Sequence, residues 1–416
     1  MPEPATLLRR LFDAAVAAAS PAQYMPAALS RLPDRDYVII GAGKAASAMA
    51  QEVVSRFPGK TRGMVIVPYG HALDCGNVEV VEAAHPVPDE AGVQAARRLL
   101  DMVSDLAVDD HAICLISGGG SALLTLPADG VPLAHKQAVT EALLTCGAPI
   151  EDINCVRKHL SAIKGGRLAA ACVPAGLTTL VISDVPGNDV SVIASGPTVA
   201  DTTTAAEAMQ LLEHYDIHPP ATVVRHLLLE HVDAEPLTPS DVHVLATADD
   251  ALRAAKQLAE SQGFEILALG DLTGDARQLA KWHATLALKI AAGNGPATPP
   301  CLILSGGETT VRVSGAGRGG RNGEYALQLM LSLDGHPAIT ALACDTDGID
   351  GTGDNAGCLV LPGSLQRCRD IGVDVIAAQA ANDSYRVFAA LDDLVMTGPT
   401  LTNVNDFRAI LVSNSL

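Results

Sequence analysis

A glycine-containing turn at residues 41–46, of sequence GAGKAA, lies between an aliphatic run and a helical pattern. We expect Gly41 and Gly43 to let the backbone approach a bound nucleotide. Lys44 would place a cation beside a helix N-terminus, a position that suits a phosphate or a carboxylate and a catalytic role in transferring either group. The alternative is that the two glycines only allow close packing of strand and helix, and that Lys44 points into solvent.

The spacing of this turn also fits the G-x-G-x-x-A variant of dinucleotide-binding turns. The NAD version requires an acidic residue about 20 residues later, at the end of the second strand. Here the second strand ends in IVPY at residues 66–69, without an acid. The sequence therefore favours a phosphate or carboxylate ligand over a nicotinamide cofactor. It does not contain the phosphate-binding pattern G-x-x-x-x-G-K-[ST] at this turn.

A second turn follows another aliphatic run and contains three consecutive glycines. Its amide groups can converge on an anion, which makes every residue of the turn a candidate for nucleotide binding. A tight turn without any ligand is the alternative. The candidate residues are Ser117, Gly118, Gly119, Gly120 and Ser121.

The third glycine-rich segment runs from Gly306 to Gly323 and holds seven glycines, with Arg312, Arg318 and Arg321 among them. Because it leads into an aliphatic helical pattern at residues 325–331, it is typical of a phosphate-binding loop at a helix start. A surface loop without a ligand is the alternative. Arg321 is the candidate catalytic group, and the candidate binding residues around it are Gly306, Glu308, Asn322 and Glu324.

A basic segment concentrates four cations within 11 residues of a chain whose formal net charge is −19. The cations are Arg157, Lys158, Lys164 and Arg167, with His159 between them. Such a local concentration predicts an anion site, for which we select Arg157 and Lys164 as substrate- or nucleotide-binding groups. A solvated helix face would explain the same pattern.

Two groups of acidic residues follow predicted strands. One is the SDVPGND segment at 183–189, and the other is CDTDGID at 344–350. Carboxylates at strand ends commonly hold Mg²⁺ that is bridged to substrate phosphates. We select Asp189 and Asp347 as metal ligands, Asp189 also as a catalytic group, and Asn188 as a binding residue. Turn formation alone is the alternative for each aspartate.

Short aliphatic runs alternate with helical patterns along the chain, which predicts an α/β fold built on an open sheet with helices on both faces. The predicted strands are 37–40, 64–67, 113–117, 177–183, 243–246, 265–269 and 301–304, and the predicted helices include 44–57 and 91–104. We expect two domains, 1–240 and 241–416, because a polar stretch at 235–240 contains two prolines. The alternative is that the opening helix packs on the second domain, which would move the boundary by tens of residues. The segment 293–300 is predicted to be a loop.

Composition excludes several classes of protein. The negative net charge argues against a general binder of nucleic acids or anionic membranes. No stretch approaches the length of a membrane span, and Leu8, Leu11, Ala15 and Ala19 fall at helical spacing, which predicts an amphipathic opening helix. Aromatic residues make up only 3% of the chain, so the core must be aliphatic. Nine scattered cysteines indicate reduced thiols in a cytoplasmic protein.

Taken together, these motifs resemble those of the class II glycerate kinases, and the resemblance covers nearly the whole chain. The matching segments are GAGKAA at 41–46, ISGGGSALL at 116–124, NCVRKHLSAIKGGRLA at 154–169, SDVPGND at 183–189, ASGPTVAD at 194–201, SGGETTV at 305–311, GRGGRNGEYAL at 317–327, CDTDGIDG at 344–351 and MTGPTLTNVNDFRAILV at 396–412.

The resemblance implies a Rossmann-like N-terminal domain, a C-terminal α/β MOFRL domain and an active site in the cleft between them. It also implies phosphorylation of D-glycerate by ATP and Mg²⁺, generally at the 2-hydroxyl. The active-site cations of the family correspond here to Lys44 and Arg321, which would clamp the transferred phosphoryl group from both domains. The remaining alternatives are an NAD(P)H-dependent hydroxypyruvate reductase, which is a name often given to members, and a non-catalytic nucleotide-binding regulator. The oligomeric state cannot be read from the residues.

Overall fold

The fold was analysed in a computed structural model, which describes residues 3–229 and 241–414. The chain forms two compact units, and each is described by itself. One unit comprises Tyr24–Leu245, and the other combines Met1–Gln23 with Ala246–Leu416. The polar stretch at 235–240, on which the predicted domain boundary depends, lies outside the described residues.

The N-terminal unit is built on a six-stranded sheet with the order β3-β2-β1-β4-β5-β6, and β3, β2, β1, β4 and β5 pair in parallel. This is the strand order of doubly wound nucleotide-binding folds, in which the chain reverses its winding between β1 and β4. The strands are β1 (Tyr37–Ala42), β2 (Thr61–Pro68), β3 (Val78–Ala83), β4 (His111–Ile116), β5 (Gly176–Ile182) and β6 (Asp241–Ala246).

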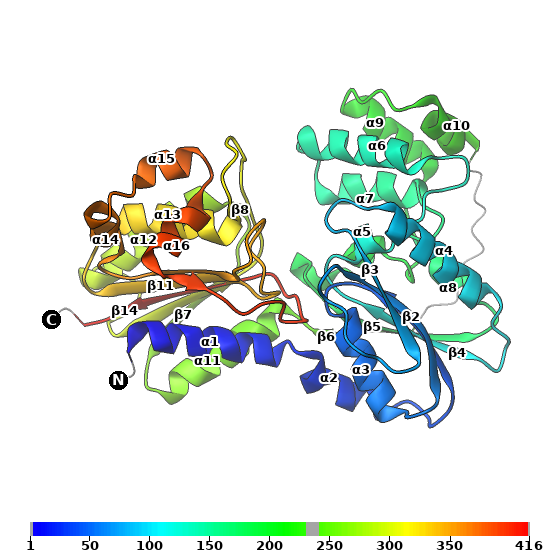
Figure 1. The fold of residues 1–416 in the computed structure, drawn as a ribbon, viewed down its shortest axis with the longest axis horizontal. Coiled ribbons are helices and arrows are strands. Elements are labelled where there is room, and N and C mark those ends of the chain that lie inside the picture. Colours follow the sequence, from blue (N-terminus) through cyan, green and yellow to red (C-terminus); the bar gives the residue numbers. More distant parts are fainter. Residues whose placement is uncertain (1–2, 230–240, 415–416) are drawn as a thin grey trace. The chain divides into compact units, whose positions relative to one another are not determined.

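Helices cover both faces of this sheet, as the alternating sequence pattern predicts (Figure 1). On β1, Val38 and Ile40 join a core with α4, while Ile39 faces the other way, because side chains alternate along a strand. The helices next to the sheet are α3 (Ala46–Arg56), α4 (Glu90–Ser104), α5 (Gly120–Leu123) and α8 (Arg167–Ala171). Two short 3₁₀ segments follow β5, namely η1 (Pro186–Asn188) and η2 (Ile193–Ser195). The core is aliphatic, as the low aromatic content requires.

Four further helices form a cluster with a hydrophobic core of its own, which the sequence analysis did not anticipate (Figure 1). They are α6 (Leu133–Thr145), α7 (Ile150–His159), α9 (Ala205–His214) and α10 (Ala221–Leu229). Val139 and Leu143 of α6 pack there against Val156 of α7 and Leu212 of α9. The basic segment predicted as one site begins on α7 and ends on α8, and it therefore does not form a single helix face.

The C-terminal unit is built on a mixed six-stranded sheet with the order β13-β12-β11-β14-β9-β7. Only β7 and β9 pair in parallel, and the other neighbours are antiparallel. The strands are β7 (Glu265–Asp271), β9 (Cys301–Gly306), β11 (Ile339–Asp345), β12 (Gly357–Val360), β13 (Leu394–Val395) and β14 (Asp406–Val412), and a separate pair is formed by β8 (Gly274–Asp275) and β10 (Thr309–Thr310). The sequence predicted β7 and β9, whereas the four antiparallel strands were missed.

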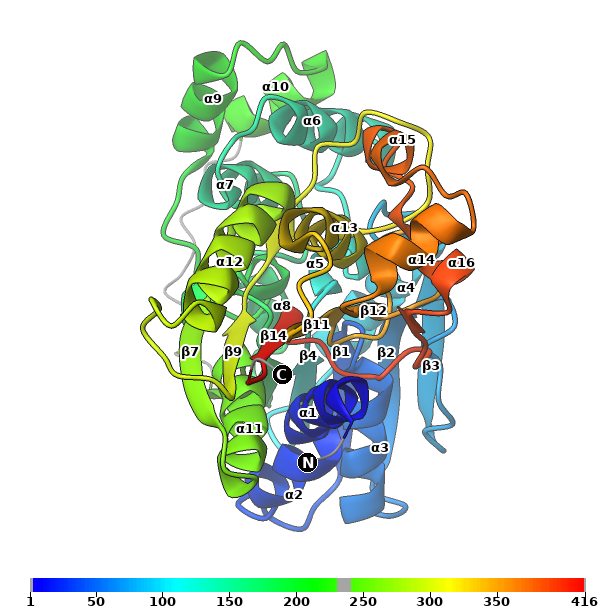
Figure 2. The same cartoon turned by 90° about the vertical axis from the view of Figure 1, so that its left-hand side faces the viewer.

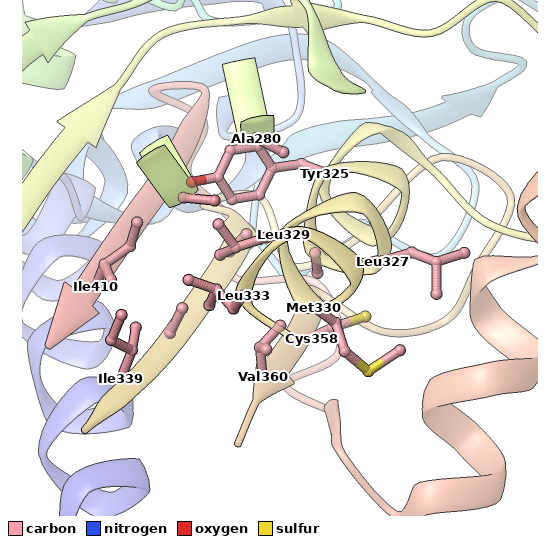
Figure 3. Packing of buried hydrophobic residues seen from close by; sticks show 14 of the residues in the cluster. Ala280, Tyr325, Leu327, Leu329, Met330, Leu333, Ile339, Cys358, Val360 and Ile410 are labelled. Carbon is pink, nitrogen blue, oxygen red and sulfur yellow. The ribbon is translucent and has the colours of Figure 1, made fainter. Parts of the chain in front are cut away.

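Helices cover both faces of the mixed sheet as well (Figure 2). One face carries α12 (Ala276–Ala291), α13 (Arg321–Leu333), α14 (Ser364–Asp370), α15 (Val375–Ala380) and α16 (Ser384–Leu391). Figure 3 shows Leu329 and Leu333 of α13 directed toward Ile339 and Ile410 of the sheet. The helix is buried along most of its length, so its N-terminus is held rigidly where the functional residues lie.

The opposite face of this sheet is covered by α1 (Pro4–Ala18) and α11 (Ala248–Ser261) (Figure 1). The predicted amphipathic opening helix is confirmed, and Phe12 of α1 packs on Phe407 of β14 with 6.0 Å between the ring centroids. The predicted domain division placed this helix in the N-terminal domain. The structure places it in the C-terminal unit, because its apolar stripe has to cover the exposed face of the mixed sheet. The remaining helix, α2 (Pro21–Leu29), spans the point where the chain passes from one unit to the other.

All nine cysteines are free, and eight of them are buried. Among residues 3–229 and 241–414, no helix has both the length and the apolar composition that crossing a bilayer requires.

Candidate active site

The first two glycine turns meet at the carboxyl ends of β1 and β4, where the winding of the sheet reverses. The amide of Lys44 donates to the carbonyl of Gly118 at 2.9 Å, and the amide of Ala45 donates to the Ser117 hydroxyl at 2.9 Å. In open α/β sheets, ligands bind at this reversal point. The two turns that the sequence singled out therefore form one structure at the position where a ligand is expected.

Gly41 and Gly43 are required by the close approach of the two strands. A Cβ atom on Gly41 would lie 2.0 Å from the Leu115 carbonyl oxygen, and one on Gly43 would lie 2.2 Å from the Ser117 hydroxyl. The amide of Gly43 is also used, since it donates to the carbonyl of Ile66 at 3.1 Å. The structure gives both glycines the packing role that the sequence analysis held open. Their contact with a nucleotide stays a prediction.

The second turn differs from the first in its amide groups. In the described part of the chain, the amides of Gly118, Gly119 and Ser121 donate to no acceptor, whereas that of Gly120 donates to Ser117. Gly119 has a left-handed backbone with φ of 80°. A Cβ on it would lie 3.5 Å from Cγ of Lys44, so the lysine side chain lies against this turn. The second turn is therefore the better candidate for a phosphate-binding turn, with Lys44 beside it.

The carboxyl end of β5 supplies the acidic segment at 183–189. Asp189 is exposed, and its Oδ1 accepts a hydrogen bond from the amide of Ser191 at 2.8 Å. Asn188 closes η1 with a left-handed backbone, at φ of 58°. Because β4 and β5 are parallel neighbours, this segment and the second glycine turn both follow carboxyl ends at the same edge of the sheet.

The basic residues of the segment 157–167 differ in whether an acidic side chain lies beside them. Lys158 and His159 are buried and lie 3.3 Å and 3.7 Å from the two carboxylate oxygens of Asp201. Lys164 is also buried, but its Nζ donates to neutral oxygens, among them the carbonyl of Ser121 at 2.8 Å. Arg157 has no hydrogen bond or ion pair within the described residues. Within the described residues, Arg157 and Lys164 are therefore the two selected basic groups that have no acidic partner.

A strained segment holds Lys164 in place. Ala194 and Ser195 have left-handed backbones, with φ of 51° and 60°, a conformation that costs non-glycine residues free energy. The carbonyl of Ala194 accepts from Lys164 Nζ at 3.4 Å, and the carbonyl of Ser195 accepts from the amide of Gly165 at 3.1 Å. The hydroxyl of Ser195 lies 2.8 Å from that of Ser121. Strain of this kind is typical of functional sites.

A pocket of about 550 Å³ opens beside these groups within the N-terminal unit. One wall is the helix α6, from which Lys136 faces the pocket. Lys136 is only 6% exposed, and its Nζ has no hydrogen-bond partner. Burial, together with the charges of Arg157 and Arg167, lowers the pKa of Lys136 to about 7. The sequence motifs do not single out Lys136. The available signal was that Leu133, Lys136, Gln137, Thr140 and Leu144 lie at the spacing of one helix face.

In the C-terminal unit, Arg321 lies at the start of α13, inside the helix rather than before it. Its three guanidinium nitrogens donate to Asp406 at 2.8 Å, Asp345 at 2.7 Å and Glu308 at 3.1 Å. Asp345 and Asp406 are directly paired on the antiparallel strands β11 and β14, where two like charges would repel each other. Burial disfavours the charged guanidinium, but the three carboxylates outweigh burial and hold the pKa of Arg321 above its ordinary value.

The N-terminus of α13 is occupied by a carboxylate of the protein itself. Asp350 accepts hydrogen bonds from the amides of Asn322 at 3.0 Å and Gly323 at 2.7 Å. Burial raises the pKa of Asp350 to about 6, although the two amide bonds lower it. Asn322 is fully buried, and its side chain donates to Asp406 at 2.7 Å. This helix end is thus already capped, which leaves the Arg321 side chain as the group that could contact a substrate.

The glycine-rich segment before α13 packs closely on other parts of the unit. A Cβ on Gly315 would lie 2.2 Å from the Ala381 carbonyl oxygen, and one on Gly320 would lie 2.3 Å from Asp350. The amide of Gly317 also donates to the carbonyl of Ala381 at 2.9 Å. The structure therefore gives these glycines a packing role, in place of the flexibility that their number suggested.

Three other predicted residues of this unit have structural uses. Glu324 is buried in an ion pair with Arg277 at 2.6 Å. Asp347 is 2% exposed, and its Oδ1 accepts from the amide of Ile349 at 2.8 Å. The carbonyl of Gly306 accepts from Arg408 at 2.7 Å. Substrate or metal binding by Glu324, Asp347 and Gly306 stays a prediction.

No group of three or more His, Cys, Asp or Glu side chains within residues 3–229 and 241–414 has the geometry of a protein-only metal site. Mg²⁺ usually takes only one or two carboxylates and completes its shell with water and substrate phosphates. Asp189 fits this requirement, because it is exposed and only its Oδ1 has a partner in the described part of the chain. Asp347 fits it less well, because its carboxylate is buried in a turn.

Two family models match the chain: one covers most of the N-terminal unit together with part of the opening segment, and the other lies within the C-terminal unit. The first is described as a domain of unknown function (DUF4147) and matches residues 7–228. The second is the MOFRL family and matches residues 301–406. The combination is the one that the sequence motifs indicated.

Relatives match over almost the full length of the chain. A protein from Agrobacterium vitis, which carries the provisional name hydroxypyruvate reductase, is 48% identical over 98% of this chain and 94% of its own. The D-glycerate 2-kinase of Thermotoga maritima is 39% identical over 89% of both chains. The glycerate 2-kinase of Pyrococcus horikoshii is 35% identical over 90% of this chain and 87% of its own.

The fold is also that of a solved relative. The crystal structure of the glycerate kinase from Thermotoga maritima covers 98% of this chain, and this chain covers 99% of it, with 36% identity and a TM-score of 0.87. Three kinds of evidence indicate the same family, namely the residues at the two sheet edges, the two family models and these relatives. The chain belongs to the glycerate kinase family of phosphotransferases, which joins a DUF4147 domain to a MOFRL domain.

Proposed function

We propose that the protein transfers the γ-phosphoryl group of ATP to the 2-hydroxyl of D-glycerate, giving 2-phospho-D-glycerate and ADP, with Mg²⁺ as the metal. The observation that carries this proposal is the joined pair of turns at the carboxyl ends of β1 and β4, with Lys44 lying against the glycine turn. Phosphoryl transfer depends on positioning and on neutralising charge, and this arrangement supplies both. The kinase relatives support the same chemistry.

In the proposed reaction, the hydroxyl oxygen of glycerate attacks the γ-phosphorus and the bond from that phosphorus to the β-phosphate oxygen breaks. The hydroxyl proton goes to a carboxylate, for which Asp189 is our candidate. Mg²⁺ would be held by Asp189 and by phosphate oxygens, and it would neutralise charge on the leaving group. Asp189 can serve either purpose because it is exposed at the sheet edge where Lys44 lies.

Lys44 and Arg321 are proposed to contact the transferred phosphoryl group, as the family resemblance implies. Arg321 is 24% exposed, and three carboxylates fix its orientation. A guanidinium held in this way needs no reorganisation when charge develops on the phosphoryl group. The carboxylates also keep the guanidinium fully charged, since they raise its pKa.

The hydroxypyruvate reductase alternative has less support. Strand β2 ends at Pro68 without an acidic residue to bind the ribose of a nicotinamide cofactor, and Glu82 on β3 accepts from the amide of Gly70 at 2.6 Å. In addition, the amides of Gly43, Lys44 and Ala45 all donate hydrogen bonds to acceptors of the protein itself. These three amides are therefore not available to bind the pyrophosphate of a dinucleotide.

The experiment that tests the proposal measures both activities in one preparation. ADP release is followed with D-glycerate and ATP, and NADH or NADPH oxidation is followed with hydroxypyruvate. We expect ADP release only, with a product whose phosphorus resonance couples to the C2 proton. Oxidation of the reduced cofactor without ADP release would establish the reductase instead. Coupling of the phosphorus to the C3 protons would show that the 3-hydroxyl is the acceptor.

A further inference from the structure

The pocket beside α6 contains cations that the protein itself does not neutralise. Lys136 Nζ is buried without a partner, and Arg157 makes no hydrogen bond or ion pair in the described part of the chain. Lys164, the third cation at the pocket, contacts only neutral oxygens. Burying unpaired charge is costly, and a folded protein retains it where a ligand of opposite charge binds. An anionic ligand in this pocket would offset that cost.

The three basic residues of the pocket lie where a single anionic ligand could contact all of them. The positive charges of Arg157 and Arg167 lower the pKa of Lys136, and those of Lys136 and Arg157 add to burial in lowering the pKa of Lys164. Lys136, Arg157 and Lys164 also all line the same pocket. Glu141 is the only acidic residue among those that line the pocket, and its side chain is exposed. The three basic groups of the pocket thus have no buried acidic partner among the residues that line it.

The other lining residues indicate that the ligand also has a large apolar part. The segment Pro86–Pro88 after β3 lines the pocket, and so do Leu133 and Leu144 of α6. Pockets for drug-sized ligands have volumes of roughly 300–1,000 Å³, and this one measures about 550 Å³. A three-carbon hydroxy acid is too small and too polar to fill it. A nucleotide has both the planar apolar base and the multiply charged phosphates that such a pocket fits.

The pocket also reaches the catalytic turn. Gly119 lines it, and a Cβ on Gly119 would lie 3.1 Å from the His85 ring, which is a second lining residue, and 3.5 Å from Lys44 Cγ. A ligand with its phosphates at this end would present them to Lys44. Val87 and Leu144, which also line the pocket, are exposed apolar residues.

We propose that this pocket is the nucleotide site, in which the base lies between α6 and the Pro86–Pro88 segment and Lys136 and Arg157 bind the phosphates. The inference rests on the proposed kinase function, and it adds Lys136 as a binding residue. It also assigns the basic segment to the nucleotide rather than to the carboxylate of glycerate.

The test uses the full-length protein and measures ADP binding by calorimetry, so that its outcome does not depend on turnover. Lys136→Met keeps the length of the side chain and removes the charge. We expect it to weaken ADP binding at least tenfold (~1.4 kcal/mol), as for a lost charge-assisted contact with a phosphate. Lys60→Met is the matched control, because Lys60 is an exposed lysine of the same unit. It should leave the Kd for ADP unchanged.

A second pair of variants tests the position of the base. Thr140 faces the pocket from α6, whereas Thr145 at the end of the same helix is exposed and does not line it. Thr140→Trp should fill the pocket and weaken ADP binding, and Thr145→Trp should not. If Thr140→Trp binds ADP normally, the base lies elsewhere and the proposal is overturned.

The affinity for D-glycerate separates this inference from the proposed function. We expect the KM for glycerate at saturating ATP to stay within about twofold in Lys136→Met, because the lysine does not contact the acid. A raised KM for glycerate with normal ADP binding would assign the pocket to the acid and overturn the proposal. If ADP binding depends on Lys136 but the protein has no kinase activity, the pocket is still a nucleotide site, and the proposed reaction is wrong.

Discussion

The Ser117 hydroxyl at the end of β4 accepts a hydrogen bond from the amide of Ala45, the residue after Lys44, at 2.9 Å. The two residues are 72 positions apart in the sequence, and both are buried. The contact ties the turn that carries Lys44 to the glycine turn at residues 117–121. It therefore fixes the position of the proposed catalytic lysine through the backbone.

This contact predicts the behaviour of Ser117→Ala. The substitution leaves a buried amide without an acceptor, which costs roughly 1–3 kcal/mol of the free energy of unfolding. We also expect kcat to fall about tenfold, because the turn no longer holds Lys44 in place. Ser104→Ala is the control. The Ser104 hydroxyl donates to the carbonyl of Leu100 in an exposed hydrogen bond within the same helix, so its loss leaves no buried amide without an acceptor. Denaturant unfolding and steady-state kinetics check both effects, and a destabilised Ser117→Ala with normal kcat would limit the contact to a structural role.

Lys44→Ala tests the proposed catalytic cation directly. We expect kcat to fall about 10²-fold or more, as when a group that stabilises charge in the transition state is lost. The melting temperature should change little, because the turn is held by backbone contacts with Gly118 and Ser117. Kinetics and thermal melting on the same preparation decide the matter. Wild-type turnover in the folded variant would remove Lys44 from the mechanism.

Arg321→Lys distinguishes catalysis from anchoring. A lysine keeps the positive charge between Asp345, Asp406 and Glu308 but cannot donate to all three in the guanidinium geometry. We expect kcat to fall about 10²-fold while the KM for glycerate stays near wild type, with a drop of a few degrees in melting temperature. Arg321→Ala should unfold far more easily, because it leaves three carboxylates unpaired. A KM defect that parallels the loss of stability would indicate anchoring only.

The lowered pKa of Lys136 predicts a stability that depends on pH. Lysine titrates near 10.5 in the unfolded chain and at about 7 in the folded protein, so between these values the unfolded chain binds more protons. The stability of the wild-type protein should therefore rise with pH from about 7 to about 10, relative to Lys136→Met. The charged or titratable groups around this lysine are Arg157, Lys164, Arg167, Glu141 and His85.

This prediction is checked by denaturant unfolding of the two proteins at pH 7 and pH 10. At pH 7 the variant should be the more stable one by at least about 1 kcal/mol, because it lacks a buried unpaired charge. The difference should shrink toward pH 10. A difference that does not change with pH would show that Lys136 titrates normally, and the buried cation would then not be poised for an anion. ADP should stabilise the wild-type protein more than the variant at pH 7.

The local features of this protein could be predicted from its sequence. The aliphatic runs at 37–40 and 113–117, which end in glycine turns, are strands followed by helices, because strand and turn propensities act over neighbouring residues. The prediction of two α/β units followed from the same alternation. The antiparallel strands β11, β12 and β14 were missed because their apolar runs do not reveal the direction of their partners. The sequence likewise left open whether the opening helix α1 packs on the first or the second domain, and the structure groups it with the second.

The charge of the site was decided by the tertiary structure. Lys158 and Lys164 look equivalent in the sequence, but Asp201, 43 residues after Lys158, neutralises only the first of them. The glycine-rich sequence before α13 predicts a phosphate site at the N-terminus of this helix. In the structure, Asp350 accepts hydrogen bonds from the amides there and caps the helix. Lys136 lies in an unremarkable helical sequence, and only the packing of distant segments around it makes it a buried cation. The sequence determined which residue types and turns are present. Burial and pairing depend on which distant residues come into contact, and only the folded chain decides that.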